Sequence, residues 1–67
     1  MKVERIKGIM AEKNITQRDL AKALGVSIAT INAKLSRKTD VKVGEIEPLC
    51  SALGITSIAD KVDIFLA

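Results

Sequence analysis

Residues 16–31, TQRDLAKALGVSIATI, contain two short apolar patterns with Gly25 between them. On each side of the glycine the apolar residues are three or four positions apart, which is the spacing of one helix face. Glycine adopts a positive φ at little cost, and Ser27 can cap a new helix two positions later. Two helices joined by so short a turn cross at a steep angle. The stretch therefore predicts a helix-turn-helix within residues 17–36.

Helices are also expected on both sides of this corner. Thr16 and Asp19 resemble a capping box for the first helix of the corner, with Asp in place of the usual Glu or Gln. Asn14 and Gly54 tolerate the left-handed conformation in which helices commonly end. Ser57 is a further helix cap near the end of the sequence. The expected helices cover about residues 3–13, 17–24, 28–36, 43–53 and 58–62.

Pro48 lies inside the fourth of these helices, where a proline is tolerated only near the first turn. The helix therefore either begins late or has a distorted first turn, and we expect the distorted turn. The buried stripe of this helix is expected at Ile46, Leu49, Cys50 and Leu53.

The composition is that of a small globular protein. Hydrophobic residues make up 48% of the 67 residues and charged residues 28%, and Phe65 is the one aromatic residue. The core must therefore be aliphatic, and a chain of this length forms one domain with a small core. We predict an all-α fold, a compact bundle of about five short helices, as a single helix-turn-helix domain over residues 1–67.

The residue inventory excludes several kinds of site. Histidine is absent and Cys50 is the one cysteine, so the usual zinc-ligand sets and Ser-His or Cys-His catalytic pairs cannot be assembled. No glycine-rich phosphate loop occurs. We expect no catalytic residue, no metal site and no cofactor, and we interpret Cys50 as a buried apolar residue. Because no apolar run has the length of a membrane helix and no signal peptide occurs, a cytoplasmic protein is expected.

The positive charge is concentrated in the middle of the sequence. Between Lys13 and Lys42 there are seven basic and two acidic residues, a net charge of +5, whereas residues 43–67 carry a net charge of −3. A basic segment around a helix-turn-helix is the electrostatic pattern of a nucleic-acid-binding surface. With so few charges, an ordinary solvated surface is the alternative.

The sequence around the corner resembles the helix-turn-helix of the lambda-repressor-like family, which includes Cro and phage-repressor proteins. The matching positions are Thr16-Gln17, Leu20-Ala21, Leu24-Gly25-Val26-Ser27 and Thr30-Ile31, with RIKGIM before them and EIEPLCSALGI after them. The resemblance implies a compact bundle of about five helices that binds specific sequences in double-stranded DNA as a dimer. The segments KLSRK and EIEPLC are most similar to small regulators encoded by phages and prophages.

In this family the second helix lies across the DNA backbone and the third helix enters the major groove. By motif position, the residues that face the bases are Ser27, Ile28, Ala29, Asn32 and Ala33. The residues placed to meet phosphates are Gln17, Arg18, Lys34, Arg37, Lys38, Thr39 and Lys42. Solvated charge is the alternative for any single one of these cations.

The base-facing positions depart from the family's common pattern of Gln, Arg, Ser or Asn. Ile28, Ala29 and Ala33 are apolar, and an apolar side chain reads only a thymine methyl group. Asn32 is the one good hydrogen-bonding residue and is suited to adenine. Either recognition depends partly on DNA shape and on contacts outside this helix, or the helix has another use.

Two function classes remain open. The first is a transcriptional regulator that binds duplex DNA, in the cytoplasm of a bacterial host if a phage encodes it. The second is a protein-interaction adaptor, antitoxin-like or an anti-repressor, that uses the same fold and an exposed Ile28. Salt-dependent DNA binding indicates the first class, and salt-independent binding that Ile28→Lys abolishes indicates the second. An enzyme has almost no support.

The end of the sequence has more apolar residues than one core face can take. The residues expected to close the core are Ile55, Ile58, Val62 and part of the run Ile64, Phe65 and Leu66. The rest of this run predicts a weak homodimer through the C-terminal residues, tightened by DNA. The alternative is a tail that folds over the first helix of a monomeric protein.

Overall fold

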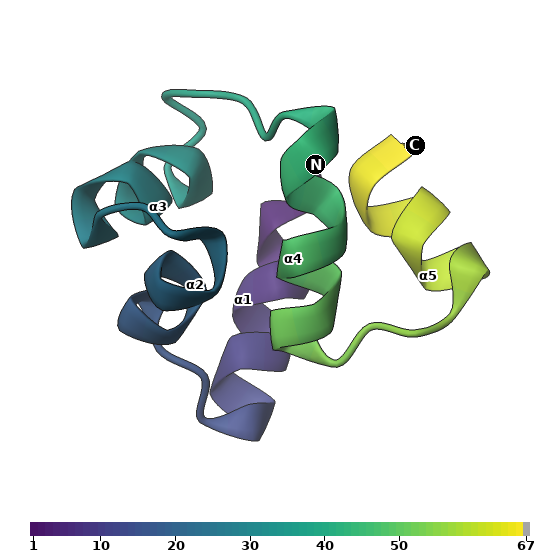
Figure 1. The fold of residues 1–67 in the computed structure, drawn as a ribbon. Coiled ribbons are helices and arrows are strands. Elements are labelled where there is room, and N and C mark those ends of the chain that lie inside the picture. The colour runs from purple at the N-terminus through teal and green to yellow at the C-terminus, as the bar shows by residue number, and fades with distance from the viewer. Residues whose placement is uncertain (67) are drawn as a thin grey trace.

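The chain folds into five α-helices and a final π-helical turn, in a computed structural model that describes residues 1–66. The helices are α1 (Val3–Lys13), α2 (Gln17–Leu24), α3 (Ile28–Leu35), α4 (Val43–Leu53) and α5 (Ile58–Lys61), and the turn is η1 (Val62–Leu66). In Figure 1, α4 lies in the centre in front of α1, with α2 and α3 on one side and α5 on the other. The predicted all-α bundle of about five short helices is confirmed. None of the helices between residues 1 and 66 has the length and apolar character that a membrane crossing requires.

The helices of the corner begin at the caps that the sequence predicts. The Asp19 N–H donates to Thr16 Oγ1 over 3.1 Å, and the Thr16 N–H donates to Asp19 Oδ2 over 2.8 Å, which completes the capping box. Ser27 Oγ accepts from the Thr30 N–H over 3.2 Å at the start of α3. These bonds satisfy backbone N–H groups that a helix start leaves unpaired. The starts of α2 and α3 therefore follow from the local sequence.

Four helices end in the same way, with a left-handed residue and a hydrogen bond back across the last turn. The left-handed residues are Asn14 (φ 57°), Gly25 (φ 69°), Arg37 (φ 61°) and Gly54 (φ 73°). In each case the N–H of the following residue bonds to the carbonyl oxygen five residues before it. These bonds join Ile15 to Met10 (2.8 Å), Val26 to Ala21 (3.0 Å), Lys38 to Ala33 (2.9 Å) and Ile55 to Cys50 (2.8 Å). The sequence predicts the left-handed ends at Asn14, Gly25 and Gly54, but not the one at Arg37.

The core is aliphatic and uses one face of each of the first four helices. Ile6 in α1, Leu20 in α2, Ile31 in α3 and Leu53 in α4 are at most 1% exposed. Cys50 is buried among them, as expected, and this burial raises the pKa of its thiol. Burial of aliphatic side chains of this size supplies about 1.5–3 kcal/mol each, so these residues dominate the stability of the bundle.

Pro48 is accommodated inside α4, which is α-helical from Val43 to Leu53. The expected distorted first turn is therefore wrong. Pro48 lies in the second turn of the helix, and its missing N–H leaves the Gly44 carbonyl oxygen without an intrahelical donor. Gly44 is exposed, so water can satisfy this oxygen.

The C-terminal helical segment differs from the expectation in its length and in the residues that it buries. It continues past Val62 as η1, and Ile64 completes the core at 0% exposure. Ile55 is buried as predicted. Ile58 is 78% exposed and Val62 is 44% exposed, so their predicted core positions are wrong.

Ion pairs with the beginning of the chain explain this orientation. Asp63 pairs with Lys2 at 2.6 Å and with Arg5, and Asp60 lies 3.8 Å from Arg5. The Lys2 N–H also donates to the Ile64 carbonyl over 2.8 Å. Hydrogen bonds from Lys2 and then Arg5 lower the pKa of Asp63. The acidic side of the segment therefore faces α1, and apolar residues on its other side are exposed.

Candidate nucleic-acid interface

α2 and α3 pack against each other across a linker of three residues, Gly25 to Ser27. Gly25 is exposed at the corner, and Val26 is half-buried against the core. A Cβ added at Gly25 would meet no atom within 4 Å, so the turn requires glycine for its backbone conformation alone. The corner leaves the N-terminus of α3 at the surface, with Ser27 and Ile28 exposed.

One face of α3 is exposed and consists mainly of small and apolar residues. Ser27, Ile28, Ala29 and Asn32 are exposed, and Ala33 is half-buried. These are the five residues that the sequence assigns to the bases. The Ser27 hydroxyl is engaged in the cap of α3, and no hydrogen bond within residues 1–66 engages the Asn32 side-chain amide. Asn32 is therefore the residue of this face best able to hydrogen-bond to a ligand.

The structure corrects the expected phosphate contact at Lys34, because this lysine is buried. Its side chain is 8% exposed. Lys34 Nζ donates to Glu45 Oε1 over 2.9 Å and to the Asp40 carbonyl over 3.2 Å. A signal for this position existed in the sequence, since Lys34 follows Ile31 by three residues and so continues the buried stripe of α3.

Arg37 ends α3 in the left-handed conformation and remains at the surface. Its Nη2 pairs with Glu4 Oε2 of α1 at 2.7 Å, and the two side chains are 61% and 78% exposed. Exposed ion pairs of this kind stabilise a fold by little, about 0–1 kcal/mol. Arg37 is therefore able to exchange Glu4 for a phosphate at small cost.

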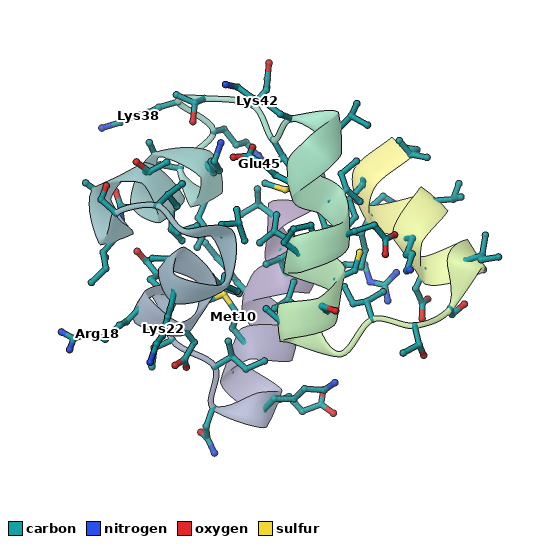
Figure 2. All side chains as sticks on the ribbon, in the orientation of Figure 1. Met10, Arg18, Lys22, Lys38, Lys42 and Glu45 are labelled. Carbon is teal, nitrogen blue, oxygen red and sulfur yellow. The ribbon has the colours of Figure 1, made fainter. Side chains whose placement is uncertain are left out.

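Exposed cations surround this face of α3 on two sides. Figure 2 shows one pair projecting from α2 and another pair from the segment between α3 and α4. The cations of these two pairs, which form no salt bridge within residues 1–66, are Arg18, Lys22, Lys38 and Lys42. Thr39 is exposed next to Lys38, and Gln17 is half-buried at the start of α2. Six of the seven residues that the sequence assigns to phosphates thus lie around the five at the exposed face of α3, and Lys34 alone is turned inward.

Two acidic residues near this surface are engaged in backbone contacts. The Lys42 N–H and then the Lys34 side chain lower the pKa of Glu45 by donating hydrogen bonds to its carboxylate. The N–H and hydroxyl of Thr16 lower the pKa of Asp19 in the same way. Both carboxylates serve the starts of helices, where negative charge is favourable.

The sequence matches a family model described as the Cro/C1-type HTH DNA-binding domain over residues 5–62. The match includes the corner at Gly25 and the cation-bearing segment after α3. Comparison with curated proteins gave no match, and comparison with solved structures gave none either. The matched family is one of DNA-binding domains and not of enzymes. The match covers most of the chain, which therefore belongs to the Cro/C1-type helix-turn-helix DNA-binding domain family.

Proposed function

We propose that this protein is a transcriptional regulator that binds specific sites in double-stranded DNA, with α3 in the major groove and α2 across the backbone. The observation that carries the proposal is the distribution of unpaired charge. Elsewhere Lys2, Arg5 and Lys61 are paired with acids. Six cations form no salt bridge within residues 1–66, and four of them flank the exposed face of α3, the other two being Lys7 and Lys13 of α1. Phosphate neutralisation by such cations supplies much of the affinity for DNA. We propose a single domain over residues 1–67, with the helix-turn-helix at 17–36.

Asn32 is the proposed reader of a base, because its amide can pair with the two adenine groups of the major groove. Ile28 and Ala29 offer apolar contact with thymine methyl groups. The Ser27 hydroxyl is engaged in the cap, and Ala33 is half-buried, so both residues contribute van der Waals contact with the groove more than hydrogen bonds. With one strong polar reader, recognition depends in part on the shape and deformability of the DNA.

The proposed phosphate contacts come from both sides of the exposed face of α3. On α2 and after α3 they are Gln17, Arg18, Arg37, Lys38, Thr39 and Lys42. Gln17 stands at the N-terminus of α2, where free N–H groups and the helix dipole favour a phosphate. Lys34 is left out of this set because it is buried against Glu45.

Selection of bound fragments from a genomic library at moderate salt identifies the operator, and fluorescence anisotropy with that duplex measures affinity. Asn32→Ala is expected to change which sequences are preferred, with a loss of about 1–3 kcal/mol at one base pair. Lys38→Ala is expected to weaken binding to all sequences alike and to reduce the salt dependence by about one ion.

Lys61→Ala is the matched control, since Lys61 lies on the far side of the bundle and pairs with Glu47. It should leave both sequence preference and salt dependence unchanged. A wild-type protein that binds no duplex in a salt-dependent way contradicts the proposed function. An Asn32→Ala variant with unchanged affinity and unchanged preference contradicts the placement of that residue in the groove.

We also propose a weak homodimer through the outer side of the C-terminal segment. The surface differs from the one expected, because Ile64 is buried and Phe65 is half-buried. Ile58, Val62 and Leu66 are exposed and four positions apart, which supports an apolar stripe along α5 and η1. Two copies joined there would read half-sites about one helical turn apart, ~34 Å.

Sedimentation at rising protein concentration tests this dimer. The wild type is expected to associate, and more strongly with operator DNA, whereas Val62→Glu is expected to stay monomeric. Ile28→Lys changes the proposed DNA-binding face of α3 and not the C-terminal segment, so this variant should associate as the wild type does. A wild type that is monomeric at high concentration and binds DNA as a single copy would remove the dimer from the mechanism.

We infer a phage or prophage origin from the resemblance of KLSRK and EIEPLC to small phage-encoded regulators, with action as a Cro-type or repressor protein in the cytoplasm of a bacterial host. The coding sequence is then expected among phage genes. A reporter gene placed behind the operator distinguishes repression, which should lower its expression, from activation, which should raise it.

The second candidate function is a protein-interaction adaptor, antitoxin-like or an anti-repressor. The observation that favours it is Ile28, which is 44% exposed beside Ala29 on the face that is proposed to read DNA. In this case high salt should leave partner binding intact and Ile28→Lys should abolish it, whereas DNA binding should decline steeply with salt.

A further inference from the structure

An ion pair between the buried Lys34 and the half-buried Glu45 contacts the segment of residues 37–42, which we call the α3–α4 segment. Lys34 Nζ donates to Glu45 Oε1 over 2.9 Å, and the same carboxylate oxygen accepts the Lys42 N–H over 2.8 Å. Lys34 Nζ also donates to the Asp40 carbonyl over 3.2 Å. One lysine of α3 and one glutamate of α4 thus hold the second half of the segment at two backbone positions.

Little else holds this half of the segment. The first half is fixed by the end of α3, where the Lys38 N–H bonds to the Ala33 carbonyl over 2.9 Å. Beneath the second half lies an open cleft of about 320 Å³, lined by Met1 and Phe65 among others. Val41 contributes one half-buried apolar contact with the core. The Lys42 carbonyl accepts the Glu45 N–H over 2.9 Å in the first turn of α4, and the Lys34–Glu45 pair is the main attachment of the second half through side chains.

We propose that Lys34 and Glu45 are positioning residues for DNA binding, and that the pair holds residues 40–42 so that Lys42 meets the DNA backbone together with Lys38, which the end of α3 fixes. The inference rests on the proposed function. A buried ion pair is by itself a weak source of stability, since the cost of removing both charges from water offsets their attraction. A segment that is already ordered binds without a further loss of conformational entropy. The pair thus acts on affinity more than on folding.

The double variant Lys34→Met, Glu45→Gln tests this role. It removes one positive and one negative charge, so the net charge of the protein is unchanged. Methionine retains the apolar volume of the lysine stem, and glutamine retains an oxygen that can accept the Lys42 N–H. We expect thermal unfolding close to that of the wild type, operator affinity about tenfold lower, and a salt dependence lower by about one ion, that of Lys42.

A double-mutant cycle separates positioning from a general structural effect. In a protein that already carries Lys38→Ala and Lys42→Ala, the change at Lys34 and Glu45 is expected to have no further effect on affinity. A further tenfold loss in that background would overturn the inference, because the pair would then act through some other part of the protein.

The failure of this inference differs from the failure of the proposed function. If the wild type binds no duplex, the proposed function fails and the inference fails with it. If Lys38→Ala weakens binding but the Lys34, Glu45 double variant binds as tightly as the wild type, DNA binding stands and the positioning role is overturned.

A measurement on the wild-type protein tests whether the α3–α4 segment is held in place, even if the double variant does not fold. Backbone order parameters of residues 38–42 in the protein without DNA are expected near 0.85, the value of rigid backbone. Values below about 0.6 would show a flexible segment, which overturns the proposal that the pair holds it in place.

Discussion

α2 and α3 end in turns that have the same hydrogen-bond pattern, but the residue after the left-handed position is half-buried in the first turn and exposed in the second. The α2 turn has Gly25 at φ 69° and then Val26, which packs against the core. The α3 turn has Arg37 at φ 61° and then Lys38, which is exposed. In both, the N–H after the left-handed residue bonds across the last helical turn, over 3.0 Å and 2.9 Å.

The difference shows what each turn contributes. A non-glycine residue in the left-handed region costs about 1–2 kcal/mol. The α2 turn avoids this cost and directs an apolar residue inward, so it supports the fold. The α3 turn accepts the cost and presents two cations at the edge of the proposed DNA-binding surface. Stability is therefore concentrated at the first turn and proposed function at the second.

The largest expected effect is at the α2 turn. Gly25→Val should lower the free energy of unfolding by about 2 kcal/mol, because a β-branched residue fits a positive φ poorly. Urea or thermal denaturation measures this loss. Gly8→Ala is the control, since Gly8 lies inside α1 with open space around its Cα, and it should stabilise the protein by about 0.5–1 kcal/mol. A neutral Gly25→Val would remove the contrast between the turns.

The next effect is at the α3 turn and has the opposite sign. Arg37→Gly should raise the free energy of unfolding by about 0.5–1 kcal/mol, because glycine adopts the φ of 61° without strain. The same variant should bind DNA more weakly, since a phosphate contact is lost. Arg37→Ala should weaken DNA binding equally without any gain in stability. Equal denaturation midpoints for the two variants would contradict the presence of strain at this turn.

A smaller effect is expected from the partner of Arg37. Glu4→Gln removes the carboxylate that lies 2.7 Å from the guanidinium, so Arg37 becomes free to bind phosphate. Affinity for duplex DNA should rise about threefold, while stability changes by less than about 0.5 kcal/mol. Glu12→Gln makes the same change in net charge on α1, at a residue with no salt bridge within residues 1–66, and should raise affinity less. Equal gains for both variants would assign the effect to net charge alone.

The smallest effect is an acid sensitivity of the region after the α3 turn. Glu45 has a pKa below its ordinary value of 4.5, so the unfolded chain binds its proton first as the pH falls. The stability that this carboxylate contributes is full above that ordinary value and is lost as the pH falls through the lower, folded pKa. Amide exchange between pH 5 and pH 3 should show Lys42 losing protection before Val26. In the Glu45→Gln variant, Lys42 should no longer lose protection before Val26. If it still does, another titrating group is responsible for the acid sensitivity.

The helix boundaries could be predicted because each depends on residues within one turn of the chain. Thr16 with Asp19, then Gly25, then Ser27 are local signals, and the structure confirms each one. The left-handed Arg37 escaped prediction because arginine carries no such signal. Its conformation follows from the hydrogen bonds that close α3.

Contacts between distant residues account for the remaining differences. Ile58 was expected inside and is outside, because Asp63 is held by Lys2, 61 positions away in the sequence. Lys34 was expected to face DNA and is buried, because Glu45 reaches it from the next helix. The exposed face of α3 could be predicted from the positions of the helix-turn-helix motif, whereas the partner of each charge could not be predicted.

The burial of Ile64 also has a consequence for the time at which the core can be completed during synthesis. Synthesis proceeds at about 5–20 residues per second, so roughly 3–12 s separate the synthesis of α1 from that of Ile64. Throughout that interval α1 lacks the residue that completes its apolar surroundings and the carbonyl that accepts the Lys2 N–H. The helices of the corner are translated within the first half of this period, yet the core that supports them closes only at its end. The core therefore cannot be complete until Ile64 has been synthesised, after the helix-turn-helix itself has been made.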